Sequence, residues 1–317
     1  MPWVVDREHL ERARRVVAEH ASPTRLVEAK ALGEGVWLKL ECEQDTGSFK
    51  LRGALAAMAA LDPTRAARGV VTASAGNHGF GLARAGARLS IPVTVFVASS
   101  TPAIKREGIA GAGATLEVVE ASGYDAVEAL AKAAAEARGV AFVSPFDDPD
   151  VAAGNGGTVG LEILAALPDV ATVVAPVGGG GLVAGLAAAR RIEGARFALV
   201  GVQSEACPAM VRSLEEGHAR LTFEGEPTLA EGLEGGVSET TFAIARAELA
   251  RMDAVSEAAI ADAMRFAKRA LDLTVEGSAA VVIAWLREHA AEVEAPIVGV
   301  VSGQNVDPEK LARLMGR

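Results

Sequence analysis

Short runs of apolar, mostly β-branched residues alternate along the chain with longer alanine-rich stretches of helical periodicity. The short runs are continuously apolar, which is typical of parallel strands covered by helices on both faces. The pattern therefore predicts an α/β fold built from open, mostly parallel sheets flanked by helices. The expected strands are Val36–Glu41, Val70–Ala73, Val93–Val97, Thr115–Val119, Val140–Ser144, Thr172–Val177, Phe197–Val202 and Ile297–Val301. The expected helices are Leu51–Leu61, Gly79–Leu89, Pro102–Gly111, Tyr124–Arg138, Val159–Leu167, Leu182–Ile192, Glu257–Leu271 and Gly277–Ala290.

The strands fall into two groups. Those between Val70 and Ser144 form one compact βα group, and the turn-rich segment Pro145–Pro149 leads out of it. A second group with its own sheet follows from Thr172 onward. We interpret Thr222–Ser238, rich in Gly, Glu and Pro, as a loop, and we expect no regulatory domain after a short C-terminal helix at Pro308–Met315.

Composition excludes several classes of protein. Half of the 317 residues are hydrophobic, which excludes a disordered chain, and the net charge of −10 and the aromatic content of 4% argue against nucleic-acid binding. No apolar run approaches the roughly 20 residues of a membrane span, and no signal peptide is expected, because the chain passes from Met1–Asp6 straight into a charged helix. Two distant cysteines, Cys42 and Cys207, indicate a reducing cytoplasmic location. The five histidines lack the spacing of zinc ligands, so we expect no protein-held catalytic metal.

A run of four glycines, Gly178–Gly181, follows the expected strand Thr172–Val177 and precedes a helix. Glycines let main-chain N–H groups converge on an anion, and the helix N-terminus adds partial positive charge. The run predicts a phosphate site. One alternative is a dinucleotide site, because Gly179–Ala184 satisfies the loose G-x-G-x-x-G/A pattern and Glu205 lies past the next strand. The other alternative is a tight turn without a ligand.

A second motif, Thr46–Ala54, places Lys50 at the start of an expected helix. The helix dipole disfavours a cation there, which suits a Schiff-base lysine that must be neutral to attack an aldehyde. Phe49 is placed to flank a flat ring. An exposed helix lysine beside a core phenylalanine is the alternative.

A third motif, Ser74–Gly79, follows the expected strand Val70–Ala73. Ser and Asn are good helix caps, and the free N–H groups of the same helix N-terminus would also bind a substrate carboxylate. A phosphate site, a lysine and a carboxylate site together fit an amino acid held beside a phosphate-anchored carbonyl cofactor.

In this order the motifs resemble the fold-type II pyridoxal-phosphate enzymes, specifically the threonine/serine dehydratases (ammonia-lyases) and the related serine racemase. The likeness extends from Trp37–Glu41 to Ser302–Asn305. The resemblance implies a two-domain, tryptophan synthase β-like fold, with a large cofactor-binding domain (1–65 and 149–317) and a small substrate-carboxylate domain (66–148). It implies pyridoxal 5'-phosphate as cofactor and a small β-hydroxy amino acid, such as L-threonine or L-serine, as substrate. The products would be a 2-oxo acid and ammonia, and we expect a cytoplasmic homodimer.

The resemblance also assigns roles to individual residues. Lys50 would carry the cofactor and take the Cα proton, Phe49 would border the ring, and Asn77 would hydrogen-bond the phenolic oxygen. Ser302 would face the pyridine nitrogen and leave it neutral, which favours β-elimination over transamination. The phosphate would bind Gly178, Gly179, Gly180, Gly181 and Leu182. The substrate would bind Ser74, Ala75, Gly76, Asn77 and His78.

Several departures from the family pattern refine these expectations. Racemizing relatives carry a serine where this chain has Ala75, so racemization is disfavoured. At the positions of a divalent-cation site found in several relatives stand Gln203, Cys207 and Ala209, so that site is expected to be lost. The segment Ala153–Thr158 is one residue longer than usual, and Gln304 replaces a glycine. Both changes affect the expected pocket beside the substrate's side chain, so the sequence does not determine which amino acid is preferred. A catalytically inactive binding protein is disfavoured because the cofactor motifs are intact.

Overall fold

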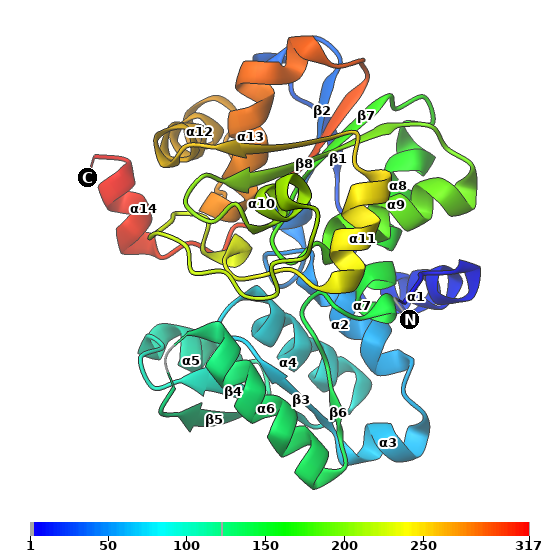
Figure 1. Ribbon diagram of the computed structural model, residues 1–317, viewed down its shortest axis with the longest axis vertical. Helices are drawn as coiled ribbons and strands as arrows, with labels where there is room; N and C mark the ends of the chain where they lie inside the picture. The colour runs from blue at the N-terminus through cyan, green and yellow to red at the C-terminus, as the bar shows by residue number, and fades with distance from the viewer. Residues whose placement is uncertain (1–2, 122, 317) are drawn as a thin grey trace.

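The computed structural model describes residues 3–121 and 123–316, and its strands form two open sheets (Figure 1). The large sheet has the strand order β1-β2-β10-β7-β8-β9, and the small sheet has the order β5-β4-β3-β6. Every pairing is parallel except that of the edge strand β1 with β2. The predicted α/β class is confirmed. The strands are β1 (Leu26–Glu28), β2 (Val36–Lys39), β3 (Val70–Ala73), β4 (Val93–Ala98), β5 (Thr115–Val119), β6 (Ala141–Phe142), β7 (Thr172–Pro176), β8 (Ala198–Ser204), β9 (Arg251–Val255) and β10 (Ile297–Val300).

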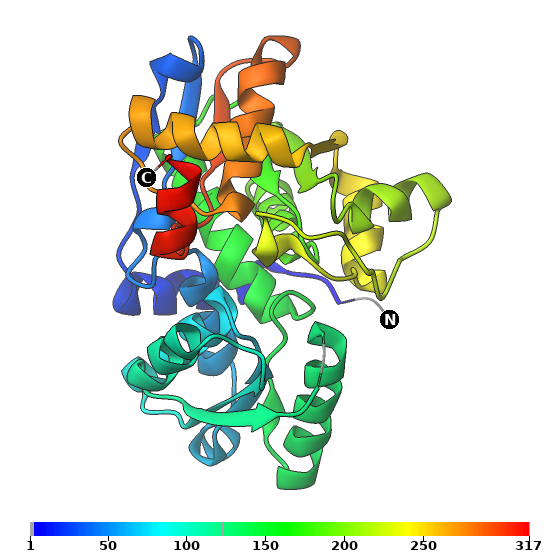
Figure 2. The same ribbon diagram turned by 90° about the vertical axis from the view of Figure 1, so that its left-hand side faces the viewer.

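Helices cover both sheets, and the small-sheet half lies below the large-sheet half in Figure 1. A quarter turn shows the same division and places the C-terminal helix α14 against the large-sheet half (Figure 2). The helices are α1 (Arg7–His20), α2 (Lys50–Ala59), α3 (Pro63–Arg68), α4 (Asn77–Leu89), α5 (Ala103–Gly111), α6 (Tyr124–Arg138), α7 (Pro149–Ala152), α8 (Thr158–Ala166), α9 (Gly181–Glu193), α10 (Ala209–Glu216), α11 (Glu239–Glu248), α12 (Glu257–Ala270), α13 (Gly277–His289) and α14 (Pro308–Leu314).

The large sheet is buried on both faces. Because successive side chains of a strand point to opposite faces, Val174 on β7 packs with α12 and α13, whereas its neighbours Val173 and Ala175 pack with α8 and α9. Burial on both faces explains why β7 is continuously apolar. The two helix layers hold the carboxyl ends of β7 and β10 in fixed positions, and the loops that follow those strands carry the glycine run and Ser302.

The small sheet is packed in the same way. Val70 on β3 contacts a cluster that includes residues of α2 and α4, and the adjacent Val71 contacts a cluster formed with α6. Helix α2 therefore shares a core with the small sheet although it follows β2 of the large sheet. This shared core fixes the start of α2 relative to the carboxyl end of β3.

The sequence pattern missed two strands, and the ends of others differ from the prediction. β1 has only three residues, and β9 carries Arg251 and Asp253, so neither displays a continuous apolar run. Both are edge strands of the large sheet. The predicted strand Val36–Glu41 ends at Lys39, because Glu41 begins a 3₁₀ turn. The predicted strand Val140–Ser144 is reduced to Ala141–Phe142, after which the chain crosses to the large sheet.

Four short helices, α3, α7, α10 and α11, were also missed. α3 has six residues and α7 has four, but both begin with an N-cap aspartate followed by proline, which is a recognisable signal for the start of a helix. The loop predicted at Thr222–Ser238 is confirmed, apart from one 3₁₀ turn at Glu231–Leu233. Among the described helices, none has the length and apolar character needed to cross a bilayer.

Candidate active site

Lys50 is the first residue of α2, and its side chain points toward the segment that leaves the small sheet. Its Nζ donates a hydrogen bond to the carbonyl oxygen of Pro145 at 2.8 Å. Burial disfavours the charged ammonium and lowers the pKa of Lys50 to about 8, although the negative charge of Glu276 opposes this shift. The amine of Lys50 is therefore much closer to neutrality at physiological pH than an exposed lysine. This environment suits a nucleophilic or basic lysine.

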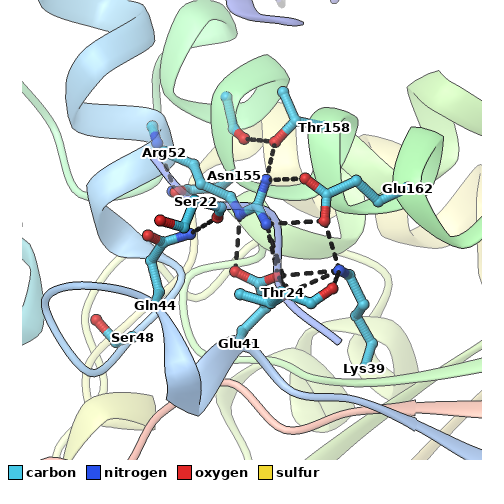
Figure 3. Close-up of polar contacts among 12 residues, drawn as sticks. Ser22, Thr24, Lys39, Glu41, Gln44, Ser48, Arg52, Asn155, Thr158 and Glu162 are labelled. Carbon is cyan, nitrogen blue, oxygen red and sulfur yellow. Dashed lines mark hydrogen bonds and ion pairs between the residues drawn. The ribbon is translucent and has the colours of Figure 1, made fainter. Parts of the chain in front are cut away.

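A buried cluster of charged side chains anchors α2 two residues beyond Lys50 (Figure 3). The guanidinium of Arg52 donates to both carboxylate oxygens of Glu41 at 2.8 and 3.0 Å, and to those of Glu162 at 2.6 and 3.0 Å. Lys39 donates to Thr24 at 2.6 Å and also to Glu162. The side chains of Arg52 and Glu41 are fully buried. Two cations thus face two carboxylates, and bidentate bonding fixes the orientation of α2.

The glycine run lies directly after β7 and forms the start of α9. A side chain at Gly180 would be strained by the φ of +96° and would meet Thr241 at 2.8 Å. A Cβ at Gly179 would lie 2.4 Å from the ring of Phe146. The first N–H groups of α9 have no partner within the helix, so they are available to an anion. A phosphate group at this run stays a prediction.

The segment Pro145–Phe146 joins the lysine to the glycine run. The carbonyl of Pro145 accepts the hydrogen bond from Lys50, and the next residue, Phe146, packs its ring against Gly179 and its backbone against Gly181. Two motifs separated by more than a hundred residues in the sequence therefore lie on either side of one short crossover segment.

Ser302 lies just past β10 and is almost fully buried. Its carbonyl oxygen accepts a hydrogen bond from the backbone N–H of Phe49 at 3.1 Å, which places it next to the start of α2. The neighbouring residues Ser48 and Gly303 form an antiparallel bridge. The ring of Phe49 lies 5.1 Å from the Nζ of Lys50. The structure thus brings Ser302, Phe49 and Lys50 together.

Asn77 is the first residue of α4, and its side chain does not cap that helix. The N-cap residue is Gly76, without a side-chain cap, so the capping interpretation of this motif is wrong. Asn77 instead reaches the large-sheet half, where its Nδ2 donates to Glu276 at 2.8 Å and its Oδ1 accepts from Asn305 at 2.7 Å. Asn77 therefore links the start of α4 to two residues of the large-sheet half.

The other residues of this motif occupy different positions. The hydroxyl of Ser74 accepts a hydrogen bond from the N–H of Gly76 at 3.2 Å, and Ala75 is partly buried. His78 is buried, and its Nε2 lies 3.2 Å from the carbonyl of Val143, so its ring faces the interior of the small-sheet half. Burial and the nearby Lys50 lower the pKa of His78 to about 3, which keeps the ring neutral. The Nδ1 of the same ring is buried and has no hydrogen-bond partner among the described residues.

The three residues at the positions of the divalent-cation site found in relatives are all buried in this structure. The Oε1 of Gln203 accepts hydrogen bonds from the N–H groups of Met210 and Val211 at 2.9 and 3.1 Å and so caps α10. Cys207 is buried, and burial raises the pKa of its thiol. Ala209 is buried at the start of α10. Gln203 therefore uses its oxygen to cap a helix.

The segment Ala153–Thr158, which we expect to be one residue longer than in relatives, contains a π-helix at Ala153–Gly157. Its Asn155 accepts a hydrogen bond from the N–H of Gly53 at 2.8 Å, on α2. A Cβ at Gly156 would lie 1.9 Å from the carbonyl oxygen of Leu182, so the π-helix also packs closely on α9. The insertion thus contacts the helices that carry the lysine and the glycine run. The other departure, Gln304, is exposed.

Sequence reasoning missed Glu276, Asn305 and Pro145. Asn305 belongs to the Ser302–Asn305 motif, so its position in that motif was a usable signal. Glu276 directly precedes α13 and is 199 residues from its partner Asn77, so no local pattern marks it. Pro145 contributes only its carbonyl oxygen, which any residue type would supply.

The chain is similar to known proteins both in sequence and in fold. Residues 17–303 match the family model described as "Pyridoxal-phosphate dependent enzyme". The chain is 36% identical to the L-threonine ammonia-lyase of Thermotoga maritima, over 98% of this chain and 78% of that one. It is 37% identical to the L-threonine ammonia-lyase of Geobacter sulfurreducens, over 100% and 79% of the two chains. The solved structure of maize serine racemase superposes with a TM-score of 0.89 at 27% identity and covers 99% of this chain and 98% of that one.

Proposed function

Because the chain belongs to the pyridoxal-phosphate-dependent enzyme family, we propose that it is an ammonia-lyase that converts a β-hydroxy amino acid such as L-threonine or L-serine to a 2-oxo acid and ammonia. The observation that carries the proposal is the position of Lys50, whose amine has a pKa near 8, lies near Ser302, and is separated from the glycine run only by the segment Pro145–Phe146. Two ammonia-lyases that align over nearly the whole chain support it. The family match supports pyridoxal phosphate over the dinucleotide alternative for the glycine run.

The residues present fit the cofactor. Gly178–Gly181 with Leu182 would hold its phosphate, Ser302 would face its ring nitrogen, and Phe49 would border the ring. When bound, pyridoxal phosphate supplies an electron-withdrawing ring that stabilises negative charge at the substrate Cα. Lys50, largely neutral above pH 8, is the group that takes the Cα proton.

The substrate carboxylate would bind at the N-terminus of α4. The main-chain N–H groups of the first turn have no partner within the helix, and the positive end of the helix dipole faces the same point. Ser74 to His78 would thereby place the Cα within reach of Lys50. Loss of the β-hydroxyl as water and hydrolysis of the product then give one 2-oxo acid and one ammonia per substrate.

Ala75 distinguishes the lyase from the alternative function, a racemase. Its methyl group offers no proton to the face of the substrate opposite Lys50, and proton transfer needs a donor within roughly 2.6–3.2 Å or one water away. We expect little D-isomer from L-serine, and we expect Ala75→Ser to raise D-isomer formation measurably. Chiral chromatography at partial conversion tests this, with Ala75→Gly as a control that changes size without adding a hydroxyl. Equal amounts of D-serine and 2-oxo acid from the unmodified protein would favour the racemase.

The capping role of Gln203 leads to a prediction about divalent metals. Its Oε1 is occupied by two amide N–H groups, and the neighbouring aligned positions are a buried thiol and a methyl group. Hard cations prefer charged oxygen ligands, which these positions lack. We expect EDTA to leave the rate of 2-oxo acid release unchanged. A loss on chelation that magnesium or manganese restores would show that a cation site lies elsewhere.

The low pKa of Lys50 predicts how cofactor attachment depends on pH. Only the neutral amine attacks an aldehyde, and a pKa of 8 in place of 10.5 makes the neutral fraction at pH 7 roughly 300 times larger. We expect the rate at which cofactor-free protein gains visible absorbance with pyridoxal phosphate to rise with pH and to level off above about pH 8. A rate that keeps rising tenfold per unit beyond pH 9 would mean that Lys50 has an ordinary pKa.

The proposal is tested with a panel of L-amino acids. L-threonine, L-serine, their D-isomers and L-alanine, which lacks a β-hydroxyl, are incubated with the holoenzyme, and both 2-oxo acid and ammonia are measured. We expect equal amounts of the two products from an L-hydroxy amino acid and none from L-alanine. Failure of every hydroxy amino acid would refute the lyase assignment. A cytoplasmic homodimer with a small domain at residues 66–148 remains our proposal for its organisation.

A further inference from the structure

A chain of side-chain hydrogen bonds holds both ends of the Asn77 amide. The two carboxylate oxygens of Glu276 lie 2.8 and 3.1 Å from the Nδ2 of Asn77 and share one of its N–H groups, which leaves the second N–H for another acceptor. On the other side, the Oδ1 of Asn77 accepts from the Nδ2 of Asn305 at 2.7 Å, and that Nδ2 also donates to the carbonyl of Thr46 at 2.8 Å. An acceptor thus faces the nitrogen end of the amide, and a donor faces the oxygen end.

Glu276 is itself held in place next to the end of β10. Its backbone N–H donates to the carbonyl of Gly303 at 3.1 Å, and a Cβ at Gly303 would lie 2.6 Å from its Oε1. Gly303 follows Ser302, so Glu276 is fixed relative to the residue assigned to the ring nitrogen. The absence of a side chain at Gly303 leaves the space that the carboxylate occupies.

The charges around Glu276 determine its protonation. Burial raises the pKa of Glu276 to about 7, and the negative charge of Glu231 acts in the same direction. The hydrogen bond from Asn77 and the positive charges of Lys105 and Lys50 oppose the shift. In its ionised form the carboxylate is an acceptor only, so it can bind the nitrogen end of Asn77 but not its oxygen end.

We propose that Glu276 is a positioning residue, which together with Asn305 fixes the orientation of the Asn77 amide so that an N–H group faces the cofactor's phenolic oxygen. The inference rests on the proposed function, because it presupposes bound pyridoxal phosphate. The two ends of an asparagine amide have nearly the same shape, so the side chain can turn over unless its neighbours distinguish them. A turned amide would direct its oxygen at the phenolic oxygen, where two acceptors repel each other.

The proposal predicts different spectroscopic effects for two substitutions of Glu276. In Glu276→Ala the acceptor is lost and only Asn305 still holds the amide, so the amide turns over in part of the molecules, and in these the ionised phenolic oxygen loses a hydrogen bond. We expect the pH midpoint of the visible absorption band of the bound cofactor to rise by about one unit and the cofactor dissociation constant to rise about tenfold. Glu276→Gln keeps an acceptor but removes the charge, and we expect its midpoint to stay unchanged or to fall.

A purely electrostatic role of Glu276 gives a different result, because removing a negative charge favours ionisation of the phenolic oxygen. Both substitutions would then lower the midpoint, and that outcome would overturn the proposal. Asn305→Ala, which leaves Glu276 in place, should raise the midpoint as Glu276→Ala does. Glu288→Gln, an exposed substitution on α13, is the matched control.

The experiment is a spectrophotometric pH titration of each holoenzyme, with cofactor affinity measured in parallel. An unmodified protein that shows no visible band would refute the proposed function. A normal band in the unmodified protein with the same midpoint in Glu276→Ala would refute only the positioning role of Glu276.

Discussion

Lys50→Ala is expected to abolish the release of 2-oxo acid and to leave the protein without covalently attached cofactor. The substitution removes the amine that forms the bond with the cofactor and also the base that takes the Cα proton. A general base alone contributes about 10²–10⁴-fold to a rate, so we expect a loss of roughly 10⁴-fold or more. The measurement compares kcat and the visible absorption of the variant with those of the unmodified protein at the same cofactor concentration.

The control for this substitution is Lys132→Ala. Lys132 is exposed on α6 and bonds to Glu128 at 2.9 Å, one turn away on the same helix. It lies outside the site, so its removal should change neither activity nor colour. Residual activity of Lys50→Ala above a hundredth of the unmodified rate would mean that another group takes the proton.

Arg52→Met is expected to lower the free energy of unfolding by about 3–5 kcal/mol, because it leaves buried carboxylates without their main partner. Glu41 would keep the hydroxyl of Thr24, at 2.5 Å, and the more distant Lys39, at 3.8 Å, but would lose two charge-assisted bonds from Arg52. Glu41 is fully buried, so water cannot replace the lost hydrogen bonds. Urea denaturation followed by circular dichroism, at a fixed saturating cofactor concentration, measures the change.

An exposed arginine that also pairs with a glutamate provides the matched control. Arg25 pairs with Glu43, but its side chain is 67% exposed. Exposed pairs contribute little because water and salt screen them, so we expect a several-fold smaller change for Arg25→Met. Equal effects of the two substitutions would mean that the cluster in Figure 3 does not anchor α2.

The sequence predicted those strands well that are buried on both faces of the sheet. β7 and β10 are covered on both faces, so they appear as apolar runs, and α6 was predicted with the bounds that the structure has. The two strands that the sequence did not predict, β1 and β9, are edge strands, and they form because they pair with a neighbouring strand although they lack a continuous apolar run. Such pairing depends on residues far away in the sequence, and local periodicity does not report it.

The residues predicted for the site lie in compact sequence motifs, and the structure places these motifs near one another. Lys50, Asn77, the glycine run and Ser302 all follow a strand or begin a helix, and the carboxyl ends of parallel strands meet at one edge of a sheet. Glu276 could not be found in this way, because its role depends on contact between α4 and the residue before α13. The π-helix at Ala153–Gly157 also required the structure, since an added residue alone does not tell whether a loop or a helix absorbs it.

The most direct test of the central claim is to locate the cofactor on the chain. The holoenzyme is reduced with borohydride, digested, and analysed by mass spectrometry for the peptide that carries the reduced pyridoxyl phosphate group. We expect one modified peptide from the Thr46–Ala54 motif, with the added mass on Lys50. Modification of a different lysine, or a protein that binds no pyridoxal phosphate, would contradict the proposed function.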